Sequence, residues 1–98
     1  MAAAVQRAVS EILITQFADD PVVSQVSIVG ADAGMQMIKL YYYSRIPNTE
    51  YRMAQITQMV RFELARRLDQ KFIPQIKFVY DDTLEKSERI EEILKDLR

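Results

Sequence analysis

"KFIPQIKFVYDDTLEKSERI", residues 71–90, contains the signals that decide the fold. Pro74 cannot continue a helix, so it ends the apolar-periodic segment before it. Alternating apolar side chains then predict a strand over 75–80. The charged run that follows predicts a helix over about 83–97. A strand between two helices needs partner strands, and the upstream sequence has to supply them.

The upstream sequence predicts two strands and two further helices. Apolar residues at helical spacing predict a first helix over 3–18, which ends at the sequence "ADDP". β-Branched residues predict a strand over 24–31, and a second strand over 35–44 follows a hairpin turn in which Gly34 is expected to take a positive φ. A long helix over about 49–71 completes the set.

The element order α-β-β-α(α)-β-α predicts an α+β fold. We expect a small three-stranded mixed sheet with the helices packed on one face. The first two strands form an antiparallel hairpin, and the third lies parallel to one of them because the connection passes through a helix. Along the second strand, alternation assigns one set of side chains to the core and the other to the opposite face: Ile38, Leu40 and Tyr42 against Met37, Lys39, Tyr41 and Tyr43.

Composition narrows the classes of function. The chain has 98 residues, 49% of them hydrophobic, which suits a single domain over 1–98. It has no cysteine and no histidine, which excludes disulfides, thiolate catalysis, Cys/His zinc sites and Ser-His-Asp chemistry. No segment approaches the ~20 apolar residues of a membrane span. The net charge is −1, yet residues 36–80 carry eight basic and three acidic groups, which suits either a phosphate-binding face or a solvated surface of mixed sign.

The pattern resembles the ribosome-binding factor A family. The C-terminal signature of that family matches "IPQIKFVYDDTLEKSERIEEIL" (73–94), and its preceding helix resembles "MVRFELARRL" (59–68). "IKLYYY" (38–43) stands where the family has a similar strand, and "FADDP" (17–21) stands where the family closes its first helix. The matching positions of the signature are Pro74, Ile76, Phe78, Asp81, Thr83, Leu84, Arg89 and Ile90.

This resemblance implies a type II KH-like fold and a factor without enzymatic activity. It implies binding to the small (30S) ribosomal subunit or its precursor, assistance in late maturation of 16S rRNA including its 5′ end, a role in growth in the cold, and release with help from a ribosome-associated GTPase. We therefore expect a cytoplasmic bacterial protein, or an organellar one, that is a monomer without cofactor, metal or membrane partner. The alternative is a KH-like protein-interaction module that dimerises through the apolar back of the hairpin.

One departure from the family concerns the long helix. The family bends its central helices at an Ala-x-Gly motif, where this chain has Ile56, Thr57 and Gln58. Without the glycine, we expect a milder bend, two helices joined there, or a bend held by the Thr57 hydroxyl on a backbone carbonyl. At the start of the helix, Asn48 or Thr49 is the expected cap.

Asp81 and Asp82 admit an enzymatic and a structural interpretation. Adjacent carboxylates after a strand could bind a hard cation or act in acid-base catalysis, with Glu85 and Glu88 as the nearby supply of further carboxylates. Neighbouring side chains at a strand end point apart, however, which disfavours a shared metal. We favour Asp82 as a helix N-cap, with Glu85 three residues later completing a variant capping box.

The candidate RNA-binding residues form a track and not one pocket. The planar guanidinium group of arginine can donate two hydrogen bonds to an RNA phosphate. The alternative interpretation of these arginines is a solvated helix face on which Glu63 pairs with Arg66 or Arg67. Tyr41 and Tyr43 are interpreted first as strand formers and second as base-stacking residues, and the methionines as core filler. The candidates are Lys39, Arg52, Arg61, Arg66, Arg67, Lys71 and Lys77.

Overall fold

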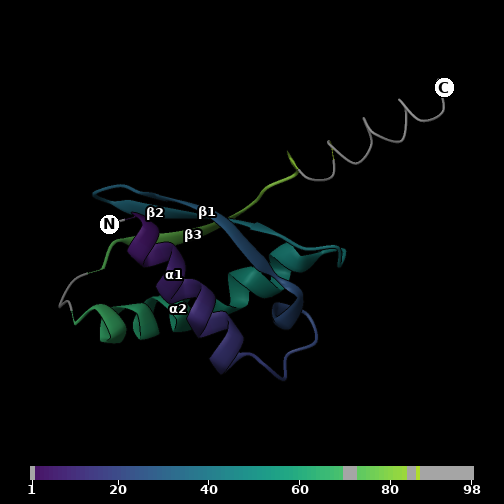
Figure 1. Cartoon of the computed structure of the whole chain (residues 1–98), viewed down its shortest axis with the longest axis horizontal. Helices are drawn as coiled ribbons and strands as arrows, with labels where there is room; N and C mark the ends of the chain where they lie inside the picture. The colour runs from purple at the N-terminus through teal and green to yellow at the C-terminus, as the bar shows by residue number, and fades with distance from the viewer. Residues whose placement is uncertain (1, 70–72, 84–85, 87–98) are drawn as a thin grey trace.

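The computed structural model describes residues 2–69, 73–83 and 86 (Figure 1). In chain order, the elements are the helix α1 (Ala2–Gln16), the short 3-10 helix η1 (Val23–Gln25), the strands β1 (Ser27–Ala33) and β2 (Met37–Tyr43), the helix α2 (Thr49–Leu68) and the strand β3 (Gln75–Tyr80). Most of the helix predicted over 83–97 lies outside the described residues.

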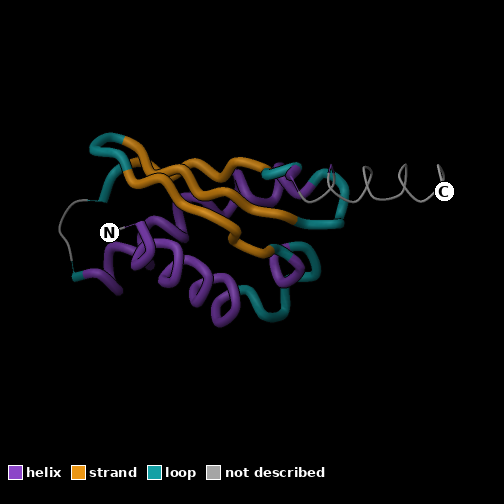
Figure 2. Tube along the Cα trace, turned by 45° about the horizontal axis from the view of Figure 1, so that its top comes forward, coloured by secondary structure: helices purple, strands orange, loops and turns teal. Residues whose placement is uncertain are grey.

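The three strands form one mixed sheet, as predicted. The strand order is β1-β2-β3, with β1 antiparallel to β2 and β3 parallel to β2. α1 packs on β1, α2 packs on β3, and the two helices pack on each other. Both helices lie on the same side of the sheet (Figure 2), so the other side of the sheet is not covered by either of them.

The core lies between the sheet and the helices. One stripe of each helix and one face of β2 supply it, at the helical and strand spacings of the sequence. The predicted inward face of β2 is confirmed, because Ile38, Leu40 and Tyr42 are each at most 3% exposed. The helices contribute Val5, Val9, Ile12, Leu13, Met53, Ile56, Val60 and Leu64.

The first strand begins three residues later than predicted. Val23–Gln25 form the turn η1, in which the backbone N–H of Val26 donates to the carbonyl of Val23 at 3.0 Å. The carboxylate of Asp20 accepts the N–H groups of Val22 and Val23 and so holds this segment in a turn. Side chain–backbone bonds of this kind compete with strand pairing, which is why the β-branched residues before Ser27 do not join the sheet.

Gly34 is needed for a different reason from the one predicted. Both glycines of the chain are described, and neither has a positive φ, so the expected left-handed turn is wrong. The N–H of Gly34 instead donates to the carbonyl of Met37 at 3.0 Å. A Cβ on Gly34 would lie 2.9 Å from that same carbonyl oxygen, which is closer than real side chains approach. The hairpin therefore requires glycine for close backbone contact.

The long helix is single and has no side-chain N-cap. α2 runs without interruption over Thr49–Leu68, so the expectation of two helices is wrong. Asn48 precedes it with a φ of 61° and makes no capping bond, and the Thr49 hydroxyl donates backward to the carbonyl of Ile46 at 2.6 Å. Its C-terminal end is closed by Asp69, whose left-handed backbone lets its N–H reach the carbonyls of the last turn.

Candidate functional site

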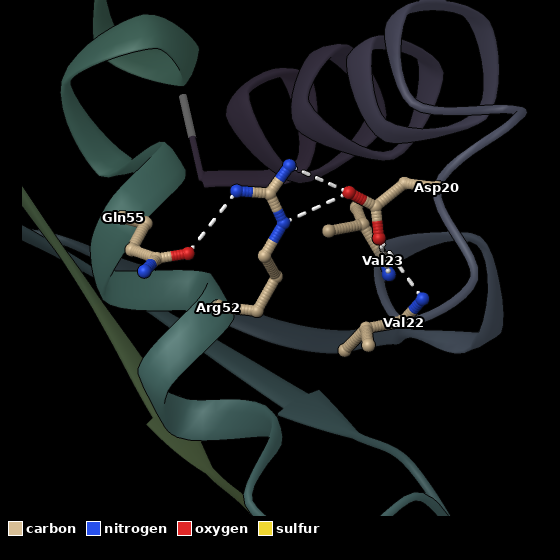
Figure 3. Close-up of polar contacts among 5 residues, drawn as sticks. All are labelled: Asp20, Val22, Val23, Arg52 and Gln55. Atoms are coloured by element: carbon tan, nitrogen blue, oxygen red, sulfur yellow. Dashed lines mark hydrogen bonds and ion pairs between the residues drawn. The ribbon is translucent and has the colours of Figure 1, made fainter.

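Arg52 is joined to the loop after α1 through Asp20 (Figure 3). Its Nε and Nη2 donate to Oδ2 of Asp20 at 2.8 and 2.6 Å, and its Nη1 donates to Oε1 of Gln55 at 3.2 Å. Oδ1 of Asp20 accepts the N–H groups of Val22 and Val23, both at 2.9 Å. The hydrogen bond from Val23 is the largest cause that lowers the pKa of Asp20; burial opposes it, and Arg52 adds to it. The guanidinium of Arg52 thus forms its hydrogen bonds with groups of the same chain.

Arg61 is bound to the chain that leads into β3. Its Nε and Nη2 both donate to the carbonyl oxygen of Ile73, at 3.2 and 2.8 Å. Ile73 is 5% exposed, and its carbonyl lies between the end of α2 and the start of β3. The side chain of Arg61 therefore fixes the connection between these two elements. We therefore expect reversal of the charge of Arg61 to cost stability.

Arg66 and Arg67 differ in how far they reach. Arg66 Nη1 pairs with Oε1 of Glu63 at 3.0 Å, which confirms the local pairing predicted on the helix surface. Arg67 instead crosses to α1, where its Nη1 lies 3.1 Å from Oε2 of Glu11 and its Nη2 donates to the Thr15 hydroxyl at 3.3 Å. The side chain of Arg66 is 67% exposed and that of Arg67 is 31% exposed, so Arg66 presents the more accessible guanidinium.

Lys39 and Lys77 are side by side on the side of the sheet opposite α1 and α2. They are register partners on the adjacent parallel strands β2 and β3, and both are exposed. Among the described residues, neither makes a hydrogen bond or an ion pair. The remaining predicted cation, Lys71, lies outside the described residues. The predicted set is therefore not one continuous track: its arginines belong to the helical layer and these two lysines to the opposite face.

The residues of the predicted bend lie within regular helix. Ile56 is buried in the core, and Gln58 is exposed. The Thr57 hydroxyl donates to the carbonyl of Met53 at 2.7 Å, which is the kind of backbone contact expected for it. The surface at this point is therefore that of an unbroken helix.

The paired aspartates at the end of β3 have structural partners. Oδ1 of Asp81 accepts the N–H of Thr83 at 2.9 Å, and Oδ2 of Asp82 lies 3.1 Å from Nζ of Lys86. Hydrogen bonds from the Thr83 side chain and backbone lower the pKa of Asp81. Glu85 lies outside the described residues, so the capping box stays a prediction. In the described part of the chain, no three acidic side chains gather as a metal site would require.

An exposed apolar stripe on α2 was not predicted from the sequence. Tyr51, Met59 and Phe62 are 69%, 56% and 64% exposed. At 100° per residue, Tyr51 and Phe62 fall about 20° apart and opposite the buried Val60, so helical angles alone could have found them. The interpretation of methionines as core filler holds for Met53, which is 1% exposed, but not for Met59.

Comparison with known proteins supports one family. A family model described as "Ribosome-binding factor A" matches residues 1–94. The ribosome-binding factor A of Limosilactobacillus fermentum is 34% identical over 105 residues, covering 99% of this chain and 87% of that protein. The factor of Methylobacillus flagellatus is 28% identical over 96 residues, covering 94% of this chain and 77% of that protein.

Solved structures share the fold. The crystal structure of ribosome-binding factor A from Thermus thermophilus superimposes with a TM-score of 0.70 at 17% identity, covering 81% of this chain and 90% of that one. A homology model of the Thermus thermophilus factor, as fitted into the cryo-EM map of a complex with the 30S subunit, gives a TM-score of 0.69 at 17% identity and covers 82% of this chain and 90% of that one. The described residues contain no helix long and apolar enough to cross a membrane. With a family model spanning nearly its whole length and a relative 34% identical over 99% of it, the chain belongs to the ribosome-binding factor A family.

Proposed function

We propose that this protein binds the small (30S) ribosomal subunit or its precursor and assists late maturation of 16S rRNA, including its 5′ end. The match of the family model to residues 1–94 carries the proposal. The Thermus thermophilus factor, whose fold this chain shares, is described in a complex with the 30S subunit, which supports a partner of the same kind here. Growth in the cold and release by a ribosome-associated GTPase belong to the same proposal.

The protein acts in this proposal by binding and not by catalysis, as a monomer of one KH-like unit and without a cofactor. Its place of action is the compartment in which small subunits mature, a bacterial cytoplasm or an organelle. The carboxylates that could have argued for an enzyme, Asp81 and Asp82, are satisfied by Thr83 and Lys86. Calorimetric titration with magnesium, manganese and calcium should therefore show no binding, and light scattering should give the mass of one chain.

Sedimentation tests the central claim. Tagged protein expressed in its host should migrate with small-subunit fractions of a sucrose gradient at low salt. Deleting the gene should leave precursors with unprocessed 16S 5′ ends, measured by primer extension after a shift to low temperature. Absence of the protein from the small-subunit fractions would contradict the binding claim. Normal 5′ ends in the deletion strain would contradict the maturation claim.

A further inference from the structure

The side of the sheet opposite α1 and α2 has its own chemical character. We call it the open sheet face and define it by Gly30 and Asp32 of β1, Lys39 and Tyr41 of β2, and Lys77 and Val79 of β3. The neighbours of these residues along β2, such as Leu40, are buried against the helices. Side chains alternate between the faces of a strand, so the six residues project away from the helical layer.

Two positive charges that have no partner among the described residues lie at the centre of this face. Lys39 and Lys77 are register partners on strands that run about 4.8 Å apart. Like charges in directly opposite positions destabilise a sheet. Asp32 is the register partner of Lys39 on the other side, but no ion pair joins them, and no described residue pairs with either lysine. An anion lying over both lysines would remove the repulsion between them.

These lysines contrast with the arginines of α2. Arg52, Arg61, Arg66 and Arg67 each donate to a group of the same chain. Of the described cationic side chains, those without an intramolecular partner are Lys39, Lys77 and Arg7, and Arg7 lies on α1 in the helical layer. The available positive charge is thus concentrated on the open sheet face.

An aromatic ring adjoins the two charges. Tyr41 is half-buried and occupies the next outward position of β2, with Gly30 as its partner on β1 and Val79 on β3. A Cβ placed on Gly30 would lie 3.6 Å from Cδ2 of Tyr41, so the ring lies beside the glycine. The ring is thus partly exposed, next to the irregular register of β1 between Ile28 and Gly30.

We propose that the open sheet face binds a single-stranded segment of RNA. Lys39 and Lys77 neutralise backbone phosphates, and Tyr41 stacks on a base. One RNA strand supplies negative charge and a planar ring together, whereas a second copy of this face would bring four lysines into contact. Three strands span a width of about 10 Å, which suits one extended strand. The identification of that RNA as 16S rRNA rests on the proposed function.

Binding of a fluorescently labelled 12-nucleotide oligouridine to the full chain tests the charge component. The Lys39→Gln/Lys77→Gln variant lowers the net charge by two, and Arg7→Glu lowers it by the same amount on the helical layer, so it is the matched control. Each lost phosphate contact reduces the salt slope by about 0.7, so the wild-type advantage over the double variant should shrink about sevenfold between 50 and 200 mM salt. Arg7→Glu should keep the wild-type slope. Equal effects of the two changes, or an unchanged slope in the double variant, would overturn the proposal.

Tyr41→Leu tests stacking while keeping an apolar cover over Gly30. It should weaken binding of the same RNA by about fivefold or more, with the salt slope unchanged. Thermal unfolding by circular dichroism identifies any loss of fold in Tyr41→Leu. The lysine variant tests the same face independently, because it leaves the ring in place. Wild-type affinity in folded Tyr41→Leu would refute stacking at this face.

A photoreactive benzoylphenylalanine in place of Tyr41 distinguishes RNA from protein in complexes with small subunits. A crosslink to rRNA supports the open sheet face as an RNA site, and a crosslink to a ribosomal protein overturns it. If wild-type protein sediments with small subunits and the lysine variant does so equally well, the inference fails and the proposed function stands. If the oligonucleotide binds through this face but the protein never sediments with small subunits, the proposed function fails and the inference stands.

Discussion

Replacing Asp20 by alanine should clearly destabilise the protein. Its carboxylate joins the turn before β1 to α2, because Oδ1 holds the turn at Val22 and Val23 and Oδ2 holds Arg52. The side chain of Asp20 is 12% exposed, so water has little access to the groups that the alanine would leave unpaired. The substitution should therefore loosen the turn before β1 and the contact between this loop and α2 together.

The magnitude follows from the separate contacts. Loss of a carboxylate that accepts backbone N–H groups costs about 1 kcal/mol, as at a helix cap. Charge-assisted hydrogen bonds contribute ~1.5–3 kcal/mol, and because the side chain of Arg52 is 38% exposed we take the lower end of that range. The sum is about 2.5 kcal/mol, equivalent to a fall in Tm of about 10–20 °C for a domain of this size. Asp20→Asn keeps an oxygen that can accept the N–H groups of the turn, so it should lose only about half of this stability.

Urea unfolding followed by circular dichroism at 222 nm measures these differences. Asp19→Ala is the matched control, because Asp19 is exposed and adjacent and carries the same charge; it should change stability by less than about 0.5 kcal/mol. A double-mutant cycle with Arg52→Met should give a coupling energy of about 1 kcal/mol. Equal stabilities of the Asp19 and Asp20 variants, or additive effects in the cycle, would refute the role assigned to Asp20.

The stability that the Asp20 carboxylate contributes should depend on pH, and the sign of this dependence can be worked out. The pKa of Asp20 is lowered in the folded protein, chiefly by the N–H of Val23. A depressed folded pKa contributes stability that is complete above the unfolded value of about 3.9 and is lost as the pH falls through the folded pKa. The stability gap between the wild type and Asp20→Asn should therefore be constant near neutrality and narrow below about pH 4. A gap that widens in acid would contradict the assignment.

Four further substitutions test the local geometry, each by urea unfolding. Gly34→Ala should destabilise the protein by at least about 1 kcal/mol, because its Cβ would lie 2.9 Å from a carbonyl oxygen. Gly30→Ala, whose Cβ would make ordinary contacts from 3.6 Å, should be neutral or should stabilise the protein by about 0.5 kcal/mol. The reverse order of stabilities would contradict the turn geometry. Arg61→Met should cost about 1–2 kcal/mol by leaving the carbonyl of Ile73 without its donor, and an unchanged midpoint would show that this contact does not hold the connection to β3. Tyr42→Phe should raise stability by up to about 1 kcal/mol, because its buried hydroxyl has no hydrogen-bond partner among the described residues; a clear loss would reveal one.

The fold could be predicted because its signals are periodic and local. Helical spacing predicted the two helices that became α1 and α2, and alternation identified the inward face that includes Leu40. The boundary errors have local chemical causes that periodicity does not register. The start of β1 is displaced by the Asp20 carboxylate, and the hairpin glycine, Gly34, is required by a close carbonyl and not by its φ.

The candidate site was harder to predict because charge partners are set by tertiary contacts. The pair Glu63–Arg66 could be predicted from its spacing of three residues. The partners of Arg52 and Arg67 lie 32 and 56 positions away along the chain, where no spacing rule reaches. For the lysines the missing information was the register of two parallel strands, which only the assembled sheet defines.

The different partners of these cations change how charge-reversal experiments on this family member should be interpreted. Arg61→Glu would place a carboxylate where two nitrogens now donate to the Ile73 carbonyl, so weaker association with ribosomes would first report damage to the connection between α2 and β3. Lys39 and Lys77 have no such internal partner among the described residues, and their removal relieves a repulsion between neighbouring strands. A loss of binding in the lysine variant without a loss of stability would therefore identify a contact surface, whereas the same loss in an Arg61 variant would not.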